Sequence, residues 1–130
     1  DLFGVGLKAR GHRIVFAGFR ADIPAFLSLF DIFAMSSKEE GLGTSVLDAM
    51  AAGLPLAVTD GGGLREMADP GKGALVSPAR DPERLAENLT ALLTQKALRD
   101  RFSAHNRRRV KDFSVEEMVK ANLAVYRELV

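Results

Sequence analysis

The sequence predicts an α/β fold in which a mainly parallel, Rossmann-like sheet lies between two layers of helices. Short apolar segments bounded by glycine or proline alternate with segments whose apolar residues recur at helical spacing. The short segments are apolar throughout, which is typical of strands buried on both faces of a parallel sheet. The chain has 130 residues, of which 47% are hydrophobic, and this is enough for one core and one domain.

Four segments are predicted as strands because each is short, apolar and followed by glycine, serine or aspartate. They are residues 14–17, 32–35, 55–59 and 74–76. In a parallel sheet, ligands bind outside the carboxyl ends of the strands, where loops lead into helix N-termini. Residues 18–20, 36–43 and 60–63 form three such loops, and the sequence predicts a site where they converge.

Helices are predicted between the strands from residues that commonly cap helices. Asp22 precedes a short helix with Pro24 in its first turn. A helix of small and apolar residues covers 44–52 and ends at Gly53, a favoured C-terminal cap. A shorter helix is predicted over 64–67, after a run of three glycines.

The C-terminal part of the chain is predicted to be helical throughout. Asp81 and Pro82 begin one helix, and Leu98 and Phe102 mark a second. Residues 114–117, Ser-Val-Glu-Glu, form a capping box at the start of the last helix. We therefore expect one partial domain over residues 1–130, with a C-terminal helix over 112–130.

The composition excludes several kinds of site. The chain has no cysteine, which excludes disulfides, zinc–thiolate sites and thiol catalysis, and fits a cytoplasmic location. Its net charge of +1 gives no global field for nucleic acid, and no apolar run approaches the roughly 20 residues that span a bilayer. The chain begins with Asp1 rather than Met, so we expect it to be a trimmed or truncated part of a longer reading frame.

Two acidic residues bracket a glycine-containing loop and the start of the small-residue helix. Glu40 lies on the loop, and Asp48 lies about one turn inside the helix, where side chains lean back toward the N-terminus. Gly41 and Gly43 allow close approach of the backbone, and the helix N-terminus at Thr44 suits a phosphate. Carboxylates accept hydrogen bonds from sugar hydroxyls, so the pattern fits a ligand that carries both phosphate and sugar.

Each acid also has an ordinary structural interpretation, which spacing alone leaves open. Asp48 can be an acid favoured by the helix dipole, or one that faces solvent. Glu40 taken by itself can be a solvated loop acid. The pairing of the two acids around the glycines favours a site.

Residues 40–55 resemble the signature of retaining glycosyltransferases of the group 1, or family 4, type, which have the GT-B fold. In that family, two acids separated by seven residues precede a helix of small residues and a Gly-x-Pro entry into a strand, here residues 53–55. The resemblance extends over nearly the whole chain from about residue 12. The further segments that carry it are residues 15–20, 33–37, 59–66, 73–78 and 81–82.

The resemblance implies that the protein transfers a sugar, with retention, from a nucleotide-diphosphate sugar to a glycan or lipid acceptor. Glu40 is implied to be the catalytic residue that holds hydroxyls of the donor sugar, and Asp48 to take the ribose hydroxyls. Gly41, Leu42 and Gly43 are implied to approach the sugar and diphosphate through the backbone. The remaining implied donor contacts are Thr44 at the phosphate and the backbone near Phe19 and Arg20 at the base. No metal and no cofactor besides the donor are implied, because cationic side chains and a helix terminus stabilise the leaving diphosphate.

The chain departs from the family pattern in three ways. Asp48 stands where glutamate is commoner, which shortens the reach by one methylene. Nothing in the chain matches the earlier segment that carries the family's diphosphate-clamping Arg and Lys, or the N-terminal acceptor domain. We therefore expect a partial C-terminal domain that does not catalyse transfer alone.

The missing segment also affects the predicted sheet. The family's first two strands lie in the middle of its sheet, so their absence leaves strand 32–35 with an open edge. We expect the edge to be repaired by direct pairing with strand 14–17, by strand exchange in a homodimer, or by residues outside the 130.

Other features have two interpretations each. A basic cluster near the end of a predicted helix consists of Arg107, Arg108, Arg109 and Lys111. It either contacts an anionic membrane at the inner face or complements the helix C-terminus, and the second interpretation is favoured. His12 and His105 are isolated and are interpreted as structural or surface residues, not metal ligands. Residues 61–63 either contact the sugar or form a plain loop.

Two other functions remain as alternatives. A nucleotide-sugar 2-epimerase would keep the GT-B fold with a different reaction. A non-catalytic, flavodoxin-like regulatory module would need a phosphoacceptor, for which Asp60 is the candidate.

Overall fold

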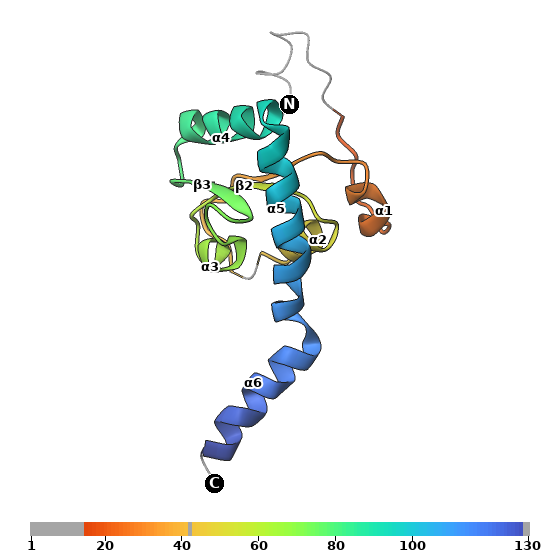
Figure 1. Ribbon diagram of the computed structural model, residues 1–130, viewed down its shortest axis with the longest axis vertical. Helices are drawn as coiled ribbons and strands as arrows, with labels where there is room; N and C mark the ends of the chain where they lie inside the picture. The colour runs from red at the N-terminus through yellow and green to blue at the C-terminus, as the bar shows by residue number, and fades with distance from the viewer. Residues whose placement is uncertain (1–14, 42, 129–130) are drawn as a thin grey trace.

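The computed structural model describes residues 15–41 and 43–128. Its centre is a parallel three-stranded sheet in the order β1-β2-β3, formed by β1 (Phe33–Met35), β2 (Leu56–Thr59) and β3 (Ala74–Ser77) (Figure 1). Ala57 lies opposite Ala34 on one side and opposite Leu75 on the other. The predicted α/β class with parallel strands is confirmed, and three of the four predicted strands form.

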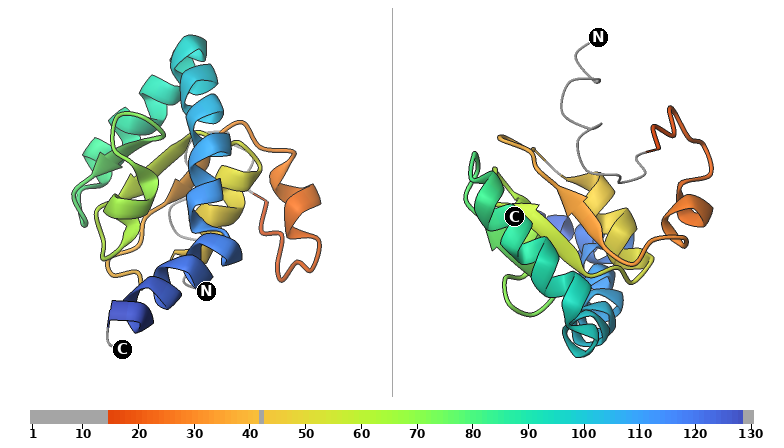
Figure 2. Two further views of the ribbon diagram at one scale, coloured as in Figure 1. Left: turned by 60° about the horizontal axis from the view of Figure 1, so that its bottom comes forward. Right: turned by 90° about the horizontal axis from the view of Figure 1, so that it is seen from above.

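Helices cover both faces of this sheet. The pleat directs Leu56 and Val58 into one core, together with α2 (Thr44–Ala51) and α3 (Leu64–Ala68). It directs Ala57 into a second core, with Leu92 of α4 (Pro82–Thr94) and Phe102 of α5 (Lys96–Arg109). The view from above shows the sheet between α2 and α4 (Figure 2).

The helix caps predicted at Gly53 and Asp81 form. Gly53 follows α2 with φ +76°, and the N–H groups of Gly53 and Leu54 donate to the carbonyls of Met50 and Ala49, which is a Schellman motif. Asp81 accepts a hydrogen bond of 2.9 Å from the N–H of Arg84 and caps α4.

Asp22 precedes α1 (Ile23–Leu27) but makes no side-chain cap. The reason is that its carboxylate binds Arg20 at 2.5 Å. Asp22 is therefore the N-cap residue as predicted, but the prediction that its side chain caps the helix is wrong.

The predicted first strand, 14–17, is not present in the described residues. Residue 14 lies outside them, and residues 15–17 have no regular secondary structure; Val15 and Phe16 are each 68% exposed. Direct pairing of 14–17 with 32–35 is therefore wrong, and β1 pairs with β2 alone among the described strands. An apolar run becomes a buried strand only when another surface covers it, and Val15 and Phe16 remain largely exposed.

The buried side chain of Asn106 fastens α5 to the sheet. Asn106 is fully buried, and its Nδ2 donates to the carbonyl oxygens of Leu54 at 2.7 Å and Gly73 at 3.0 Å. A Cβ atom on Gly73 would collide with the Asn106 amide, so glycine is required there. One side chain thus joins α5 to the segments that lead into β2 and β3.

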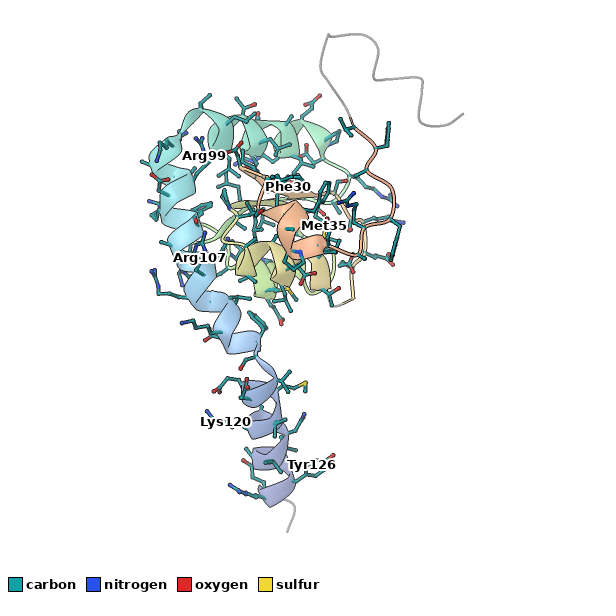
Figure 3. All side chains as sticks on the ribbon, turned by 90° about the vertical axis from the view of Figure 1, so that its right-hand side faces the viewer. Phe30, Met35, Arg99, Arg107, Lys120 and Tyr126 are labelled. Atoms are coloured by element: carbon teal, nitrogen blue, oxygen red, sulfur yellow. The ribbon has the colours of Figure 1, made fainter. Side chains whose placement is uncertain are left out.

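The last helix, α6 (Val115–Glu128), extends away from the sheet after a 3₁₀ turn, η1 (Val110–Phe113) (Figure 1). The Ser114 hydroxyl accepts from the N–H of Glu117 at 3.3 Å, as expected for the predicted capping box. Lys120 and Tyr126 project from this helix (Figure 3). None of the helices in the described ranges is both long and apolar enough to cross a membrane.

Phe102 provides a test of the second core. Replacing Phe102, which is 0% exposed, with alanine removes a packed ring, and we expect a loss of about 3–5 kcal/mol of unfolding free energy. Phe19→Ala is the matched control, because Phe19 is 97% exposed, and it should change stability by no more than about 0.5 kcal/mol. Urea unfolding followed by circular dichroism measures both. Equal effects of the two substitutions would contradict the assignment of Phe102 to the core.

Candidate functional site

Two loops meet at the carboxyl edge of the sheet. Because β1 and β2 are parallel, the loop after β1 (residues 36–43) and the loop after β2 (residues 60–63) leave the same edge. The Thr59 hydroxyl donates to the carbonyl of Ser37 at 2.5 Å, and the N–H of Gly63 donates to the carbonyl of Glu40 at 3.3 Å. The convergence predicted for these two loops is confirmed.

Glycine is what allows the two loop backbones to touch. Gly62 has φ +60°, and a Cβ atom there would collide with the carbonyl of Glu40. A Cβ atom on Gly61 would lie 2.8 Å from the carbonyl oxygens of both Ser37 and Lys38. These positions therefore have a structural role in holding loop 36–43 in place, in addition to any contact with a ligand.

The N-terminus of α2 opens from this junction. Its N-cap is Gly43 with φ +50°, and because glycine has no side chain, no side chain of the N-cap binds the first N–H groups of the helix. Those of Thr44 and Ser45 have no acceptor among the described residues, while Val46 donates to the carbonyl of Gly43 at 2.7 Å. Unpaired N–H groups at the positive end of a helix dipole form an anion site.

Gly43 also packs closely against α3. A Cβ atom at this position would lie 2.6 Å from a methyl group of Leu64, at the start of α3. The start of α3 therefore packs close to the start of α2, and a larger residue at this position would require the Leu64 side chain to move and would be strained by the positive φ.

Along the chain, one acid precedes this helix terminus and the other lies one turn inside the helix. The half-buried Glu40 accepts a hydrogen bond of 3.2 Å from the Ser37 hydroxyl to Oε2, which orients its carboxylate. Asp48 is exposed, one turn or roughly 6 Å along α2 from Thr44. No acidic residue lies in the first turn of α2, so the interpretation of Asp48 as a first-turn dipole acid is wrong. No ion pair with a described residue engages either carboxylate.

A groove of about 580 Å³ borders the same loops. Gly41, Thr44 and Gly63 line one side of it, and neither Glu40 nor Asp48 does. The opposite wall comes from η1 and α6, through Asp112, Phe113, Ser114, Glu117, Met118 and Ala121. Sequence reasoning missed this wall, because helical periodicity does not show where the last helix packs.

Phe19 and Arg20 show no described contact with loops 36–43 and 60–63. The Arg20 guanidinium pairs with Asp22 and lies 5.2 Å from the ring of Phe26 on α1, while Phe19 projects into solvent. Leu42 lies outside the described residues. The structure thus brings together Glu40, Gly41, Gly43 and Thr44, with Asp48 one turn away.

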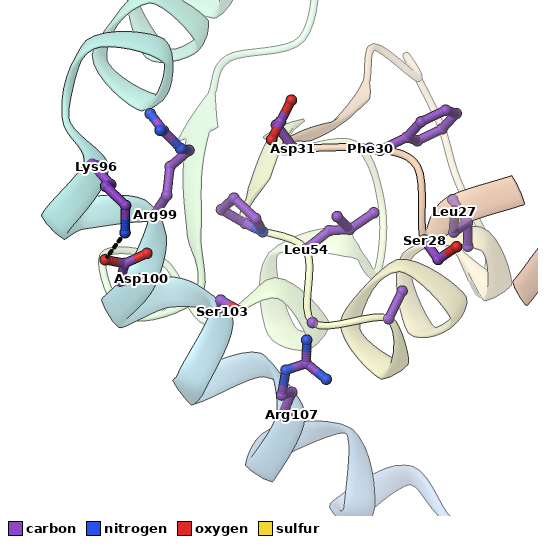
Figure 4. A pocket seen from close by; sticks show the side chains of 13 residues that line it. Leu27, Ser28, Phe30, Asp31, Leu54, Lys96, Arg99, Asp100, Ser103 and Arg107 are labelled. Atoms are coloured by element: carbon purple, nitrogen blue, oxygen red, sulfur yellow. Dashed lines mark hydrogen bonds and ion pairs between the residues drawn. The ribbon is translucent and has the colours of Figure 1, made fainter. Parts of the chain in front are cut away.

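A different hollow, of about 300 Å³, lies at the amino edge of the sheet between α1, the end of α2 and α5 (Figure 4). Three of its charged residues, Lys96, Arg99 and Asp100, have protein partners. Lys96 pairs with Asp100 at 2.7 Å, and Arg99 donates to the carbonyl of Leu92 at 2.5 Å. The Arg107 guanidinium packs against Gly53, where a Cβ atom would collide with it. This hollow is therefore distinct from the junction of the two loops.

The other candidate residues have structural partners. Three of the four cations in the predicted basic cluster, Arg107, Arg108 and Arg109, occupy the last turn of α5, as expected for complementing a helix C-terminus. His105 Nε2 lies 3.0 Å from Asp69 Oδ2 without the directional geometry of a hydrogen bond. His12 lies outside the described residues.

Asp60 also makes a hydrogen bond within the fold. Its Oδ1 accepts from the N–H of Ala79 at 2.8 Å, which links the ends of β2 and β3. This contact gives the Asp60 carboxylate a structural role and does not test the regulatory-module alternative.

Comparison with known proteins identifies relatives of this chain. A family model described as "Glycosyl transferases group 1" matches residues 5–95. The chain is 31% identical over 120 residues to the lipopolysaccharide core biosynthesis mannosyltransferase LpsB of Rhizobium meliloti (strain 1021). The match covers 90% of this chain and 34% of that protein. It is 32% identical over 108 residues to spore coat protein SA of Bacillus subtilis (strain 168), covering 81% of this chain and 29% of that protein.

A solved structure shares the fold. Sucrose-phosphate synthase from Thermosynechococcus elongatus matches with a TM-score of 0.71 and 27% identity, over 80% of this chain and 26% of that one. The chain spans about a third of the length of the curated relatives that it matches.

Gly62 tests the contact between the loops. We expect Gly62→Ala to destabilise the chain more than Gly71→Ala, because both positions have positive φ but only Gly62 faces a backbone carbonyl. At Gly71, where nothing lies within 4 Å, the cost should be the conformational strain alone, about 1–2 kcal/mol. Urea denaturation gives both values. If the two variants are equally stable, the two backbones are not packed as described.

Proposed function

This chain belongs to the group 1 glycosyl transferases and has the architecture of a GT-B segment, and on that basis we propose that it binds a nucleotide-diphosphate sugar at loops 36–43 and 60–63. The observation that carries the proposal is the glycine-capped N-terminus of α2 beside Glu40. There, unpaired N–H groups and a carboxylate without a cationic partner in the described ranges lie at one loop junction.

The diphosphate is assigned to the start of α2. The N–H groups of Thr44 and Ser45 can donate to phosphate oxygens, and the exposed Thr44 hydroxyl adds a further donor. When the bond between the sugar and the diphosphate breaks, negative charge develops on the leaving oxygen. A fixed helix terminus stabilises that charge without reorganising during the reaction.

The two acids are assigned to opposite ends of the donor. Glu40, oriented by Ser37 and held at the glycine contact, accepts hydrogen bonds from hydroxyls of the transferred sugar. Asp48, one turn further along α2, accepts from the ribose hydroxyls. Gly41 and Gly43 allow the backbone to approach the ligand between them.

We place this chain in the donor half of a retaining transfer of a hexosyl group. One relative is named a mannosyltransferase, and the similar solved structure is named a sucrose-phosphate synthase. Since the chain spans about a third of its relatives, the acceptor is assigned to the portion of the longer proteins that it does not match. The 130 residues by themselves are expected to bind the donor without transferring the sugar.

An epimerase with the same fold differs in one measurable respect. It would convert a nucleotide sugar in the absence of an acceptor, whereas a transferase would not release a new nucleotide sugar. Incubation of a full-length relative with the donor alone, followed by chromatography, separates the two reactions.

Asp48 tests the ribose contact. In NMR titrations with UDP, GDP and ADP, the preferred nucleotide should shift the amides of loop 36–41 and of the first turn of α2. Asp48→Ala should weaken that binding by about 1–3 kcal/mol, since a charged acceptor is lost. Asp100→Ala, which removes an exposed acid of α5, is the control and should leave binding unchanged. Absence of any shift at millimolar nucleotide would contradict the donor site.

Glu40 tests the sugar contact separately. If it binds the sugar, Glu40→Gln should reduce the affinity for the nucleotide sugar by about fivefold or more while the affinity for the nucleotide diphosphate stays the same. Glu39→Gln changes the neighbouring exposed acid and should alter neither. Calorimetry with both ligands measures the difference. A parallel loss for both ligands would place Glu40 at the diphosphate or in the fold instead.

A further inference from the structure

Positive charge in this chain is concentrated on one segment. Residues 96–113, which form α5 and η1, contain seven Lys and Arg residues and two Asp residues, for a net charge of +5, although the whole chain carries +1. The remaining residues are therefore net negative by four charges. Such an asymmetry creates a local attraction for anions that the overall charge does not reveal.

Part of this charge lines a hollow. A cavity of about 390 Å³ lies between α5 and the turn that precedes β3, and we call it the basic hollow; its lining residues are Gly71, Lys72, Arg101, His105 and Arg108. The three α5 residues are spaced four and three positions apart, which places them on one side of the helix. Every side chain of the lining is basic.

The acids near the basic hollow are already paired. Asp69, outside the lining, lies 3.0 Å from His105 and 3.6 Å from Lys72. On the same segment, Asp100 pairs with Lys96 and Asp112 with Arg109.

Arg101 and Arg108 keep their charge available. Neither has a carboxylate partner within residues 15–41 and 43–128. Their planar guanidinium groups match the geometry of phosphate oxygens, to which they donate two hydrogen bonds at once. Lys72 adds a cation from a separate element, so the hollow can surround an anion on two sides.

We propose that the basic hollow is a second anion site, which binds a phosphate or diphosphate group. It adjoins the turn that enters β3, at the amino edge of the sheet, whereas loops 36–43 and 60–63 lie at the carboxyl edge. The two sites therefore bind independently. The phosphate can belong to a soluble molecule or to a lipid headgroup, since both present the same charged oxygens.

Site-resolved NMR of the 130-residue chain tests the proposal with inorganic pyrophosphate as the probe. We expect shifts of the amides of Gly71, Lys72 and the α5 residues 101–108, apart from any shifts in loop 36–43. The double variant R101A/R108A should weaken this response about tenfold or more, because charge-assisted hydrogen bonds are lost. The control K120A/R127A removes the same two charges from α6 and should leave it unchanged; Lys120 is labelled in Figure 3. Thermal unfolding checks that both variants fold.

Vesicle co-sedimentation distinguishes the source of the phosphate. Binding of pyrophosphate without binding to phosphatidylglycerol vesicles indicates a soluble ligand. Binding to those vesicles and not to neutral phosphatidylcholine, with loss in R101A/R108A alone, indicates a headgroup. No response to either probe overturns the proposal. Equal losses in the two double variants, or shifts confined to loop 36–43, also overturn it.

Discussion

The direct contact between two loop backbones at the carboxyl edge of the sheet is the constraint on which the rest of the candidate site depends. Gly61 and Gly62 lie against the carbonyl groups of loop 36–41, and a side chain at Gly62 would occupy the position of the Glu40 carbonyl oxygen. The position of Glu40 is thus set by the loop after the next strand. The N-terminus of α2 lies close to α3, where a Cβ atom on Gly43 would be 2.6 Å from a methyl group of Leu64.

This arrangement explains why glycine is concentrated where a charged ligand is proposed to bind. A loop that is free in solution would lose conformational entropy on binding, and that loss would reduce affinity. Here the backbone of loop 36–41 is already held by hydrogen bonds from Thr59 and Gly63. The donors at the start of α2 therefore need little reorganisation to receive a diphosphate, which is the condition for electrostatic stabilisation of a leaving group.

The opposite edge of the sheet is organised around α5. Asn106 joins this helix to the segments that enter β2 and β3, and α5 with η1 carries seven of the 18 Lys and Arg residues of the chain. One helix thus carries both the buried Asn106 hydrogen bonds to the sheet and a cationic surface. The separation of the two edges keeps a second anion site, if occupied, from competing with the donor loops.

The sequence by itself determined the class of fold, most of the element boundaries and the pairing of Glu40 with a glycine-capped helix start, because these depend on local apolar spacing, caps and turn residues. Asp81 and Gly53 cap their helices as their types predict. Tertiary structure decided what depends on residues far apart in the chain. Residues 15–17 form no strand and stay exposed, and Asp22 binds Arg20 instead of capping α1. The wall formed by α6 and the assembly of Lys72 with Arg101, His105 and Arg108 likewise follow from packing, which one-dimensional periodicity does not encode.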